Sequence, residues 1–256
     1  MRRILVHLCS TLLAITLVVG AMAAFALAAS VRARSGEWAV PHESDLRVLV
    51  SDPGSAFTPQ PSRVIYLERA EITVLGGVDD AAAYESSLVP IGRLARVPRY
   101  RASNKSWRRL VTCVAGKFKD FDVEVTDKLP ANGDYILVKV GGAPSDIGIR
   151  GRELGGIAPY NGRAIPNSLV FVFDQPGRFR TKNNCETAAH EIGHVYGLDH
   201  TFKCGDMMTY KQGCGKKTFK KQDMSCGEKK QRGCKGDTPT QNSWGQLLSV
   251  LGAREE

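Results

Sequence analysis

Apolar and polar residues recur along this chain with the periods of regular secondary structure. One apolar stripe predicts a helix that Ser106 caps, and its members are Trp107, Leu110, Val111, Val114 and Phe118. After it, Phe121, Val123 and Val125 alternate with polar residues, which indicates a half-buried strand. The change of period therefore predicts a helix followed by a strand.

Continuous apolar runs indicate further strands. Residues 63–69 (RVIYLER) and 135–140 each predict a strand, and the wholly apolar run 169–173 (LVFVF) predicts a central strand covered on both faces. Residues 184–196 predict a helix that ends at Gly197, because glycine commonly terminates helices.

A last helix is predicted near the C-terminus. Asn242 or Ser243 can cap it, and its apolar stripe consists of Trp244, Leu247, Leu248 and Leu251. Asp79 and Asp80, followed by alanines, indicate a turn. This order of strands and helices predicts an α/β domain built on a twisted sheet.

The N-terminus has the features of an export signal. A short basic start precedes an uncharged, mostly apolar run over residues 4–31, and residues 26–28 (ALA) fit a small-x-small cleavage pattern. We therefore expect residues 1–29 to be a signal peptide and the protein to be secreted or periplasmic. The run is also long enough to remain as an uncleaved membrane anchor. Residues 30–62 contain four prolines and predict a linker or short pro-segment.

The composition fits one globular domain. The chain has 256 residues, of which 43% are hydrophobic and 24% charged, and a formal net charge of +9. These values exclude collagen-like, fully disordered and multi-pass membrane proteins, and the length allows one substantial core. Beyond Cys9, six cysteines remain. An even number in an exported chain predicts up to three disulfides, and the sequence does not choose among the fifteen possible pairings.

The segment HEIGHVYGLDH holds three of the chain's five histidines. His190 and His194 are four positions apart, so on a helix they project from one face and can bind one zinc ion. Glu191 flanks that face, where a general base for a zinc-bound water belongs. Gly197 can adopt a positive φ, end the helix and let His200 return as a third ligand. Three protein ligands leave a fourth position for water, which is typical of a catalytic zinc site.

HEIGHVYGLDH resembles the long zinc-binding motif HExxHxxGxxH of the metzincin metallopeptidases. Metzincins also have a tight methionine turn beneath the metal, and Met208 fits it, with Met207 as the rival. In the astacin-like and serralysin-like branches a tyrosine follows that methionine by two positions, where Tyr210 stands. The resemblance implies that Tyr210 binds zinc in the resting state or stabilises the oxyanion. A packed aromatic is the alternative.

The resemblance implies a catalytic domain over residues 63–256, with a twisted, mostly parallel sheet, one antiparallel edge strand, an active-site helix and a C-terminal helix. Residues 155–159 (GGIAP) are the candidate edge strand. An extended peptide could add to it through backbone hydrogen bonds, which makes Gly156, Ile157 and Ala158 candidate substrate-binding residues. A glycine-rich loop is the alternative.

Residues 202–235 form a basic, cysteine-rich segment with ten basic residues, three acidic residues and four cysteines. It has too few apolar residues for a core of its own, so disulfides are expected to staple it. Its charge suggests a preference for acidic substrates or steering to an anionic surface, and a solvated lysine surface is the alternative. The segment has few aromatic residues that could stack on bases, such as Tyr210 and Phe219, so nucleic-acid binding is not expected.

Calcium is possible but finds little support. Asp79, Asp80, Asp146 and Asp174 could be ligands, because calcium prefers carboxylates and carbonyls, but each is more often a turn former. A second zinc ion in the basic segment is not expected either, since CxxC pairs are absent and export favours disulfides.

We therefore expect an exported zinc endopeptidase, a monomer that hydrolyses peptide bonds in proteins. His190, His194 and His200 hold the metal, and Glu191 takes a proton from the zinc-bound water and passes it to the leaving amine. The alternative is a catalytically silent zinc-containing module that docks to an anionic surface through the basic segment. Another amide, such as a peptidoglycan cross-link, is a variant of the same chemistry. Membrane contact is expected only if residues 4–31 stay uncleaved.

Overall fold

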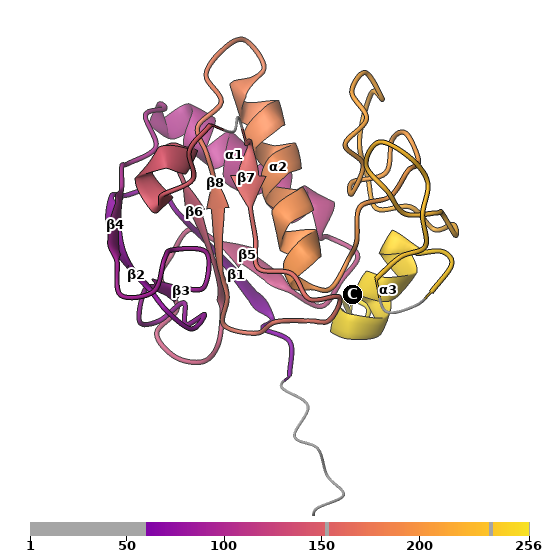
Figure 1. The fold of residues 1–256 in the computed structure, drawn as a ribbon, viewed down its shortest axis with the longest axis horizontal. Coiled ribbons are helices and arrows are strands. Elements are labelled where there is room, and N and C mark those ends of the chain that lie inside the picture. The colour runs from indigo at the N-terminus through magenta and orange to yellow at the C-terminus, as the bar shows by residue number, and fades with distance from the viewer. Residues whose placement is uncertain (1–59, 152–153, 236–237, 256) are drawn as a thin grey trace, which may run out of the picture. The chain divides into compact units, whose positions relative to one another are not determined.

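A computed structural model describes residues 60–151, 154–235 and 238–255. Its larger sheet has the strand order β5-β1-β6-β8-β7, and the strands are β5 (Glu124–Thr126), β1 (Val64–Glu68), β6 (Ile136–Val140), β8 (Leu169–Val172) and β7 (Gly156–Ile157). Every pairing in it is parallel except that of β7, which runs antiparallel to β8 at the edge (Figure 1). The expected α/β class, with a mostly parallel sheet and one antiparallel edge strand, is confirmed.

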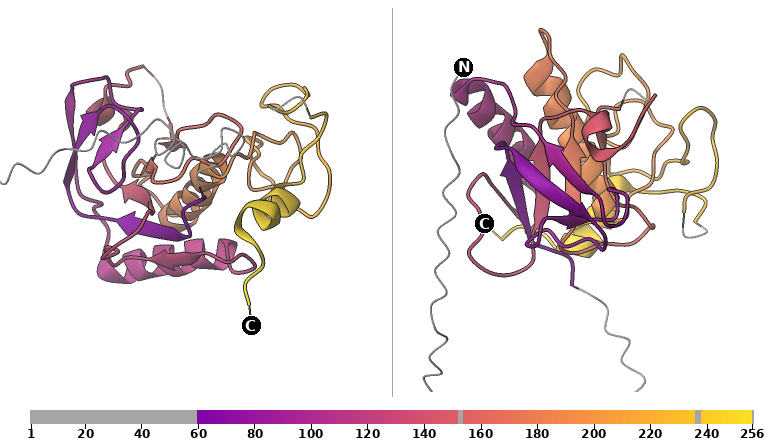
Figure 2. Two further views of the ribbon diagram at one scale, coloured as in Figure 1. Left: turned by 90° about the horizontal axis from the view of Figure 1, so that it is seen from below. Right: turned by 60° about the vertical axis from the view of Figure 1, so that its left-hand side comes forward.

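Two different layers cover this sheet. Helices α1 (Asn104–Lys117) and α2 (Arg180–Val195) pack on one face. The other face is covered by a smaller sheet in the order β3-β2-β4, which the sequence pattern did not predict (Figure 2). Its strands, and a short 3-10 helix that packs beside them, are β2 (Ile72–Gly76), β3 (Glu85–Ser86), β4 (Leu94–Val97) and η2 (Pro144–Ile147).

Side chains of the central strands alternate between these two layers. In β1, Ile65 and Leu67 join the hydrophobic cluster under the helices, whereas Tyr66 joins the cluster under the smaller sheet. In β8, Val170 faces the helices and Phe171 faces the smaller sheet. Both faces of β8 are therefore buried, which explains why its sequence is apolar at every position.

Two helix boundaries differ from the expected ones. The cap of α1 is Ser103, whose Oγ accepts a hydrogen bond from the Ser106 backbone N–H at 3.2 Å. The expectation that Ser106 caps this helix was wrong, and Ser106 lies in the first turn. Helix α2 begins at Arg180, before the expected start at residue 184, because its first turn is polar and adds nothing to the apolar periodicity.

Three disulfides are present, as the cysteine count predicted. Cys113–Cys185 joins α1 to α2, whereas Cys204–Cys214 and Cys226–Cys234 close short loops within the basic segment. They suggest an oxidising, extracellular environment. Among the described residues, none of the helices is long and apolar enough to cross a membrane. The expected signal peptide (1–29), and the expected linker (30–62) except for its last three residues, lie outside the described residues.

The chain between α2 and α3 (Ser243–Leu251) forms turns and isolated bridges over its described residues (Figure 1). Its buried side chains, among them Met207, Met208 and Phe219, join the main hydrophobic cluster. This agrees with the expectation that the basic segment has no core of its own. Asn242 caps α3, as expected, by accepting the Gly245 backbone N–H at 2.8 Å.

Candidate metal centre and active site

The fold brings three histidines together at the C-terminal end of α2. His190 and His194 lie one turn apart on the helix, and both are buried. Gly197 follows the helix with φ of +87°, and a Cβ there would lie 3.0 Å from the Arg163 backbone, so glycine suits this turn on two counts. The turn returns His200 to the helix. His194 Nε2 lies 3.1 Å from His190 Nε2 and 2.9 Å from His200 Nε2.

The other ring nitrogen, Nδ1, of each histidine faces an acceptor. For the two helical histidines the acceptors are the backbone oxygens of Met207 and Leu198, at 3.0 and 2.7 Å. For His200 the acceptor is the Glu228 carboxylate at 2.7 Å. A neutral imidazole carries one ring proton, and these contacts favour its position on Nδ1. Each Nε2 therefore presents a lone pair, and the three lone pairs converge.

Burial keeps the two helical rings neutral. It lowers the pKa of His190 well below the ordinary value, and the neighbouring rings of His194 and His200 lower it further. Burial likewise lowers the pKa of His194 to about 4, with an added contribution from His200. Both rings are unprotonated at neutral pH, which is the form that binds metals.

The donor set fits a metal ion. The three imidazoles form one of the clusters of potential metal ligands among the described residues. Tetrahedral ligands about 2.0–2.1 Å from a zinc ion lie about 3.3–3.4 Å apart. The observed separations of 3.1 and 2.9 Å are close to that value. Lone pairs held this close repel one another, and a cation between them relieves the repulsion. The triad is thus a possible metal-binding site.

Glu191 follows His190 on α2 and faces the edge strand β7. It is only 8% exposed, and Gly156 of β7 lies so near that a Cβ there would be 2.8 Å from Glu191 Cγ. Burial raises the pKa of the Glu191 carboxyl to about 8. A cation held by the histidines would act in the opposite direction, because positive charge favours the carboxylate. Glu191 is therefore a buried carboxyl group that can gain or lose a proton beside the triad.

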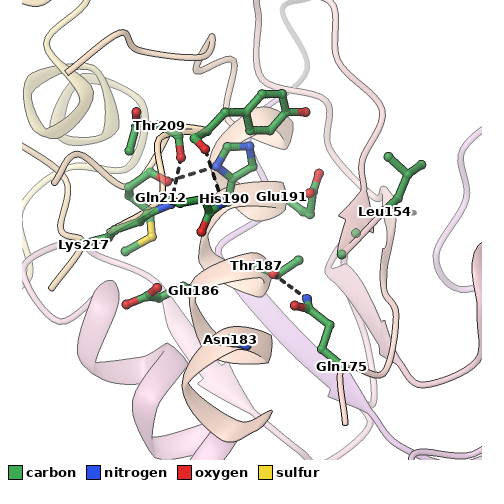
Figure 3. A pocket seen from close by; sticks show the side chains of 14 residues that line it. Leu154, Gln175, Asn183, Glu186, Thr187, His190, Glu191, Thr209, Gln212 and Lys217 are labelled. Atoms are coloured by element: carbon green, nitrogen blue, oxygen red, sulfur yellow. Dashed lines mark hydrogen bonds between the residues drawn. The ribbon is translucent and has the colours of Figure 1, made fainter. Parts of the chain in front are cut away.

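A cleft of about 570 Å³ opens beside the triad (Figure 3). Its lining comes from residues 154–156, from one face of α2 and from parts of residues 207–217. In Figure 3, Glu191 lies between His190 and Leu154 on the β7 side of the helix. The cleft thus joins the edge strand, the glutamate and one histidine of the triad in a single open space.

The expected substrate-binding residues occupy different positions. Gly156 lines the cleft, whereas Ile157 packs in the cluster under the smaller sheet. Both belong to β7, which confirms the expected edge strand. Ala158 lies just beyond β7 and packs against the main cluster. The outer edge of β7 pairs with no other strand in the described part of the chain.

Met208 packs against α2 at Gly193, which lies between His190 and His194. It is fully buried, and a Cβ at Gly193 would lie 2.5 Å from Met208 Sδ, so the glycine makes room for the sulfur. Asp206 holds the chain turn that contains Met208, because its Oδ1 accepts the Met208 backbone N–H at 2.9 Å. Met207, the rival candidate, offers its backbone oxygen to His190 and lines the cleft.

Tyr210 lies beside the triad as well. Its ring centroid is 4.1 Å from that of His200 and 5.6 Å from that of His190. The residue is 52% exposed and lines the cleft, so it is not part of the hydrophobic core. Partial burial raises the pKa of its hydroxyl, and the Glu191 charge adds to the effect. The hydroxyl is therefore protonated at neutral pH and can donate a hydrogen bond.

Sequence reasoning missed three charged residues around His200. Glu228 accepts hydrogen bonds from His200 and from Arg232, at 2.7 and 2.8 Å, and Arg232 also pairs with the buried Asp199 at 2.6 Å. Partial burial raises the pKa of Glu228, but the hydrogen bonds from His200 and Arg232 lower it by more, so its net pKa lies below the ordinary value. The sequence offered one signal for Glu228, which is an acidic residue within the basic segment.

The aspartates considered for calcium serve turns and an ion pair. Asp80 accepts the backbone N–H groups two and three residues after it, and Asp79 accepts the Ser87 backbone N–H. Asp146 accepts the backbone N–H three residues before it, and Asp174 pairs with Arg180. None of the four belongs to a cluster of potential metal ligands in the described part of the chain.

No protein-family model matches this chain, and no curated protein matches it in sequence. The features that bear on function are the histidine triad, the neighbouring glutamate, the edge strand and the cleft.

Proposed function

We propose that this protein is a zinc-dependent endopeptidase with a metzincin-like arrangement. The observation that carries the proposal is the convergence of three histidine Nε2 atoms beside a buried glutamate at an open cleft. A metal that only stabilises the fold needs neither the adjacent carboxyl group nor the cleft, and structural zinc sites usually have four protein ligands.

Zinc is the ion we propose for the triad. His190, His194 and His200 would hold it through three neutral imidazoles, a ligand set known in catalytic zinc sites. When bound, zinc polarises the scissile carbonyl and lowers the pKa of a water molecule to about 7. The backbone oxygens of Met207 and Leu198 face the Nδ1 atoms of His190 and His194 and fix the orientation of these two rings. The ligands are therefore already oriented before a substrate binds.

Glu191 is the proposed general base and general acid. Its carboxylate accepts the proton of the attacking water and then donates that proton to the leaving amine nitrogen. Burial raises the pKa of this carboxyl group, and a bound cation would lower it, so the two effects oppose each other at Glu191. Gly156 leaves space beside the carboxyl group because it has no side chain.

The outer edge of β7 is the proposed docking site for the substrate backbone. An extended peptide can pair with the exposed edge of a strand, which favours polypeptides over small amides. Tyr210 is proposed to donate a hydrogen bond to the carbonyl oxygen as negative charge develops on it. Its protonated hydroxyl and its place in the cleft support this role.

The cleft is lined by charges of both signs, so it gives only partial support to a preference for substrates with acidic side chains. Lys217 lines it, but its Nζ donates to the Thr209 backbone oxygen at 2.9 Å, and Glu186 lines the same cleft with opposite charge. Most other basic residues of the segment 202–235 are exposed. They support steering toward an anionic surface more than selection within the cleft.

Product analysis tests the proposal. Zinc-loaded protein incubated with casein should release fragments cut at internal peptide bonds. The summed mass of the two fragments from each cut should exceed the mass of the uncut segment by one water. A chelator such as 1,10-phenanthroline should stop the reaction, and added zinc should restore it. Mass spectrometry of the fragments is the measurement. Trimming only from chain ends, or cleavage that survives the chelator, would contradict the proposal. Bound zinc without any cleavage would favour the silent docking module.

A further inference from the structure

The three proposed ligands are not held in the same way. His190 and His194 lie on α2, and their Nδ1 atoms face backbone oxygens. His200 lies beyond the helix in a segment without regular secondary structure, and its Nδ1 faces a side chain, the Glu228 carboxylate. The orientation of the His200 ring therefore depends on a residue 28 positions further along the chain.

Glu228 lies in a hairpin turn closed by the Cys226–Cys234 disulfide. Within it, the Cys226 and Arg232 backbones exchange two hydrogen bonds of 3.1 and 2.8 Å. The disulfide and this bridge fix both ends of the turn that carries Glu228. Much of the conformational freedom of the turn is therefore removed before any metal binds.

A glycine joins the same turn to the backbone of His200. Gly227 donates its N–H to the His200 backbone oxygen at 2.8 Å. Its φ is +131°, and a Cβ there would lie 1.9 Å from the Lys230 backbone oxygen. Only glycine fits without a shift of the backbone. The turn is thus held directly against the segment that carries the third histidine.

Arg232 connects the two acidic residues that contact His200. Arg232 donates to Glu228 at 2.8 Å and, with two nitrogens, to Asp199 at 2.6 and 2.9 Å. Asp199 in turn accepts the His200 backbone N–H at 2.7 Å. The Glu228 carboxylate is therefore oriented by a partner of its own and does not rely on the histidine alone.

We propose that Glu228 is a positioning residue for the third metal ligand. Its carboxylate accepts the Nδ1 proton of His200, fixes the plane of the ring and increases the electron density at Nε2, which strengthens the nitrogen as a metal donor. The segment between the methionine turn and α3 thereby takes part in building the site. This inference rests on the proposed zinc site.

Zinc affinity of the intact, disulfide-bonded chain tests the inference. Dissociation constants come from competition with a chromophoric chelator, with zinc alone as the probe. Glu228→Ala should weaken zinc binding by about 10–100-fold. Glu228→Gln should lose less, because its amide oxygen can still accept the Nδ1 proton. Asp223→Asn, which neutralises an exposed carboxylate in the same segment, is the matched control and should bind as the wild type does.

A spectroscopic readout separates positioning from general loss of structure. In the cobalt(II)-substituted proteins, the visible absorption bands of Glu228→Ala should shift, since the ligand field changes with the His200 ring, and those of Asp223→Asn should not. If Glu228→Ala fails to fold, Glu228→Met decides, because it keeps the length of the side chain but removes the acceptor of the His200 Nδ1 proton. Wild-type affinity and unchanged spectra in the Glu228 variants would overturn the inference while leaving a zinc-binding, active wild type intact. A wild type that binds no zinc would overturn this inference and the proposed function together.

Discussion

Replacing Glu191 by glutamine should lower the rate of peptide hydrolysis by about 10²–10⁴-fold while zinc stays bound. Glutamine has nearly the shape of glutamate, so the buried packing against β7 is kept. Its amide cannot accept the proton of the attacking water or return one to the leaving amine. The measurement is the rate of casein cleavage at saturating zinc, with the zinc content of the same sample determined by elemental analysis.

The matched control for this variant is Glu124→Gln, which removes a carboxylate from an exposed position on β5. It should cleave casein at the wild-type rate. A Glu191→Gln protein that holds zinc and loses less than about tenfold in rate would show that another group handles the proton. Loss of zinc together with activity would instead assign Glu191 a part in metal binding, against its proposed role.

Replacing His194 by alanine should abolish zinc binding, activity and zinc-dependent stabilisation together. His194 Nε2 is the atom within 3.1 Å of both other Nε2 atoms, so its loss leaves two ligands that no longer meet around one point. At a free zinc concentration about 1,000 times the dissociation constant, the wild type should gain about 4 kcal/mol in its free energy of unfolding. The variant should gain almost none. Denaturant unfolding with and without zinc measures both values.

Metal-free proteins provide the control for this variant. Comparing His194→Ala with the wild type in the presence of a chelator isolates the effect of the lost side chain on packing. The zinc-dependent difference then belongs to the metal site alone. Stabilisation of the variant by zinc to the wild-type extent would contradict the triad as the binding site.

Elements with a strong, long hydrophobic pattern were predictable from the sequence. The run at 169–173 became the buried strand β8, and the periodic segment near residues 184–196 became most of α2. The smaller sheet was missed because its strands are short: β3 has two residues, and the alternation in β2 (Ile72–Gly76) covers only five. Such segments gain their stability from packing against the larger sheet, which local periodicity does not report.

The histidine triad was predictable for a simple geometric reason. A spacing of four residues on a helix aligns two side chains, and a glycine at the helix end can turn the chain back toward them. Glu228 had no comparable signal. Its contact with His200 depends on how the chain closes between Cys226 and Cys234, and the sequence allowed fifteen pairings of six cysteines. Long-range contacts of irregular segments follow from the fold and not from spacing.

The most direct test of the zinc endopeptidase proposal is the rate of casein cleavage as zinc is added back to the metal-free wild type. We expect the rate to rise from zero in proportion to occupancy and to level off at one ion per chain. A chain that fills one zinc site and still leaves casein uncut, or one that cleaves equally well without metal, would contradict the proposal.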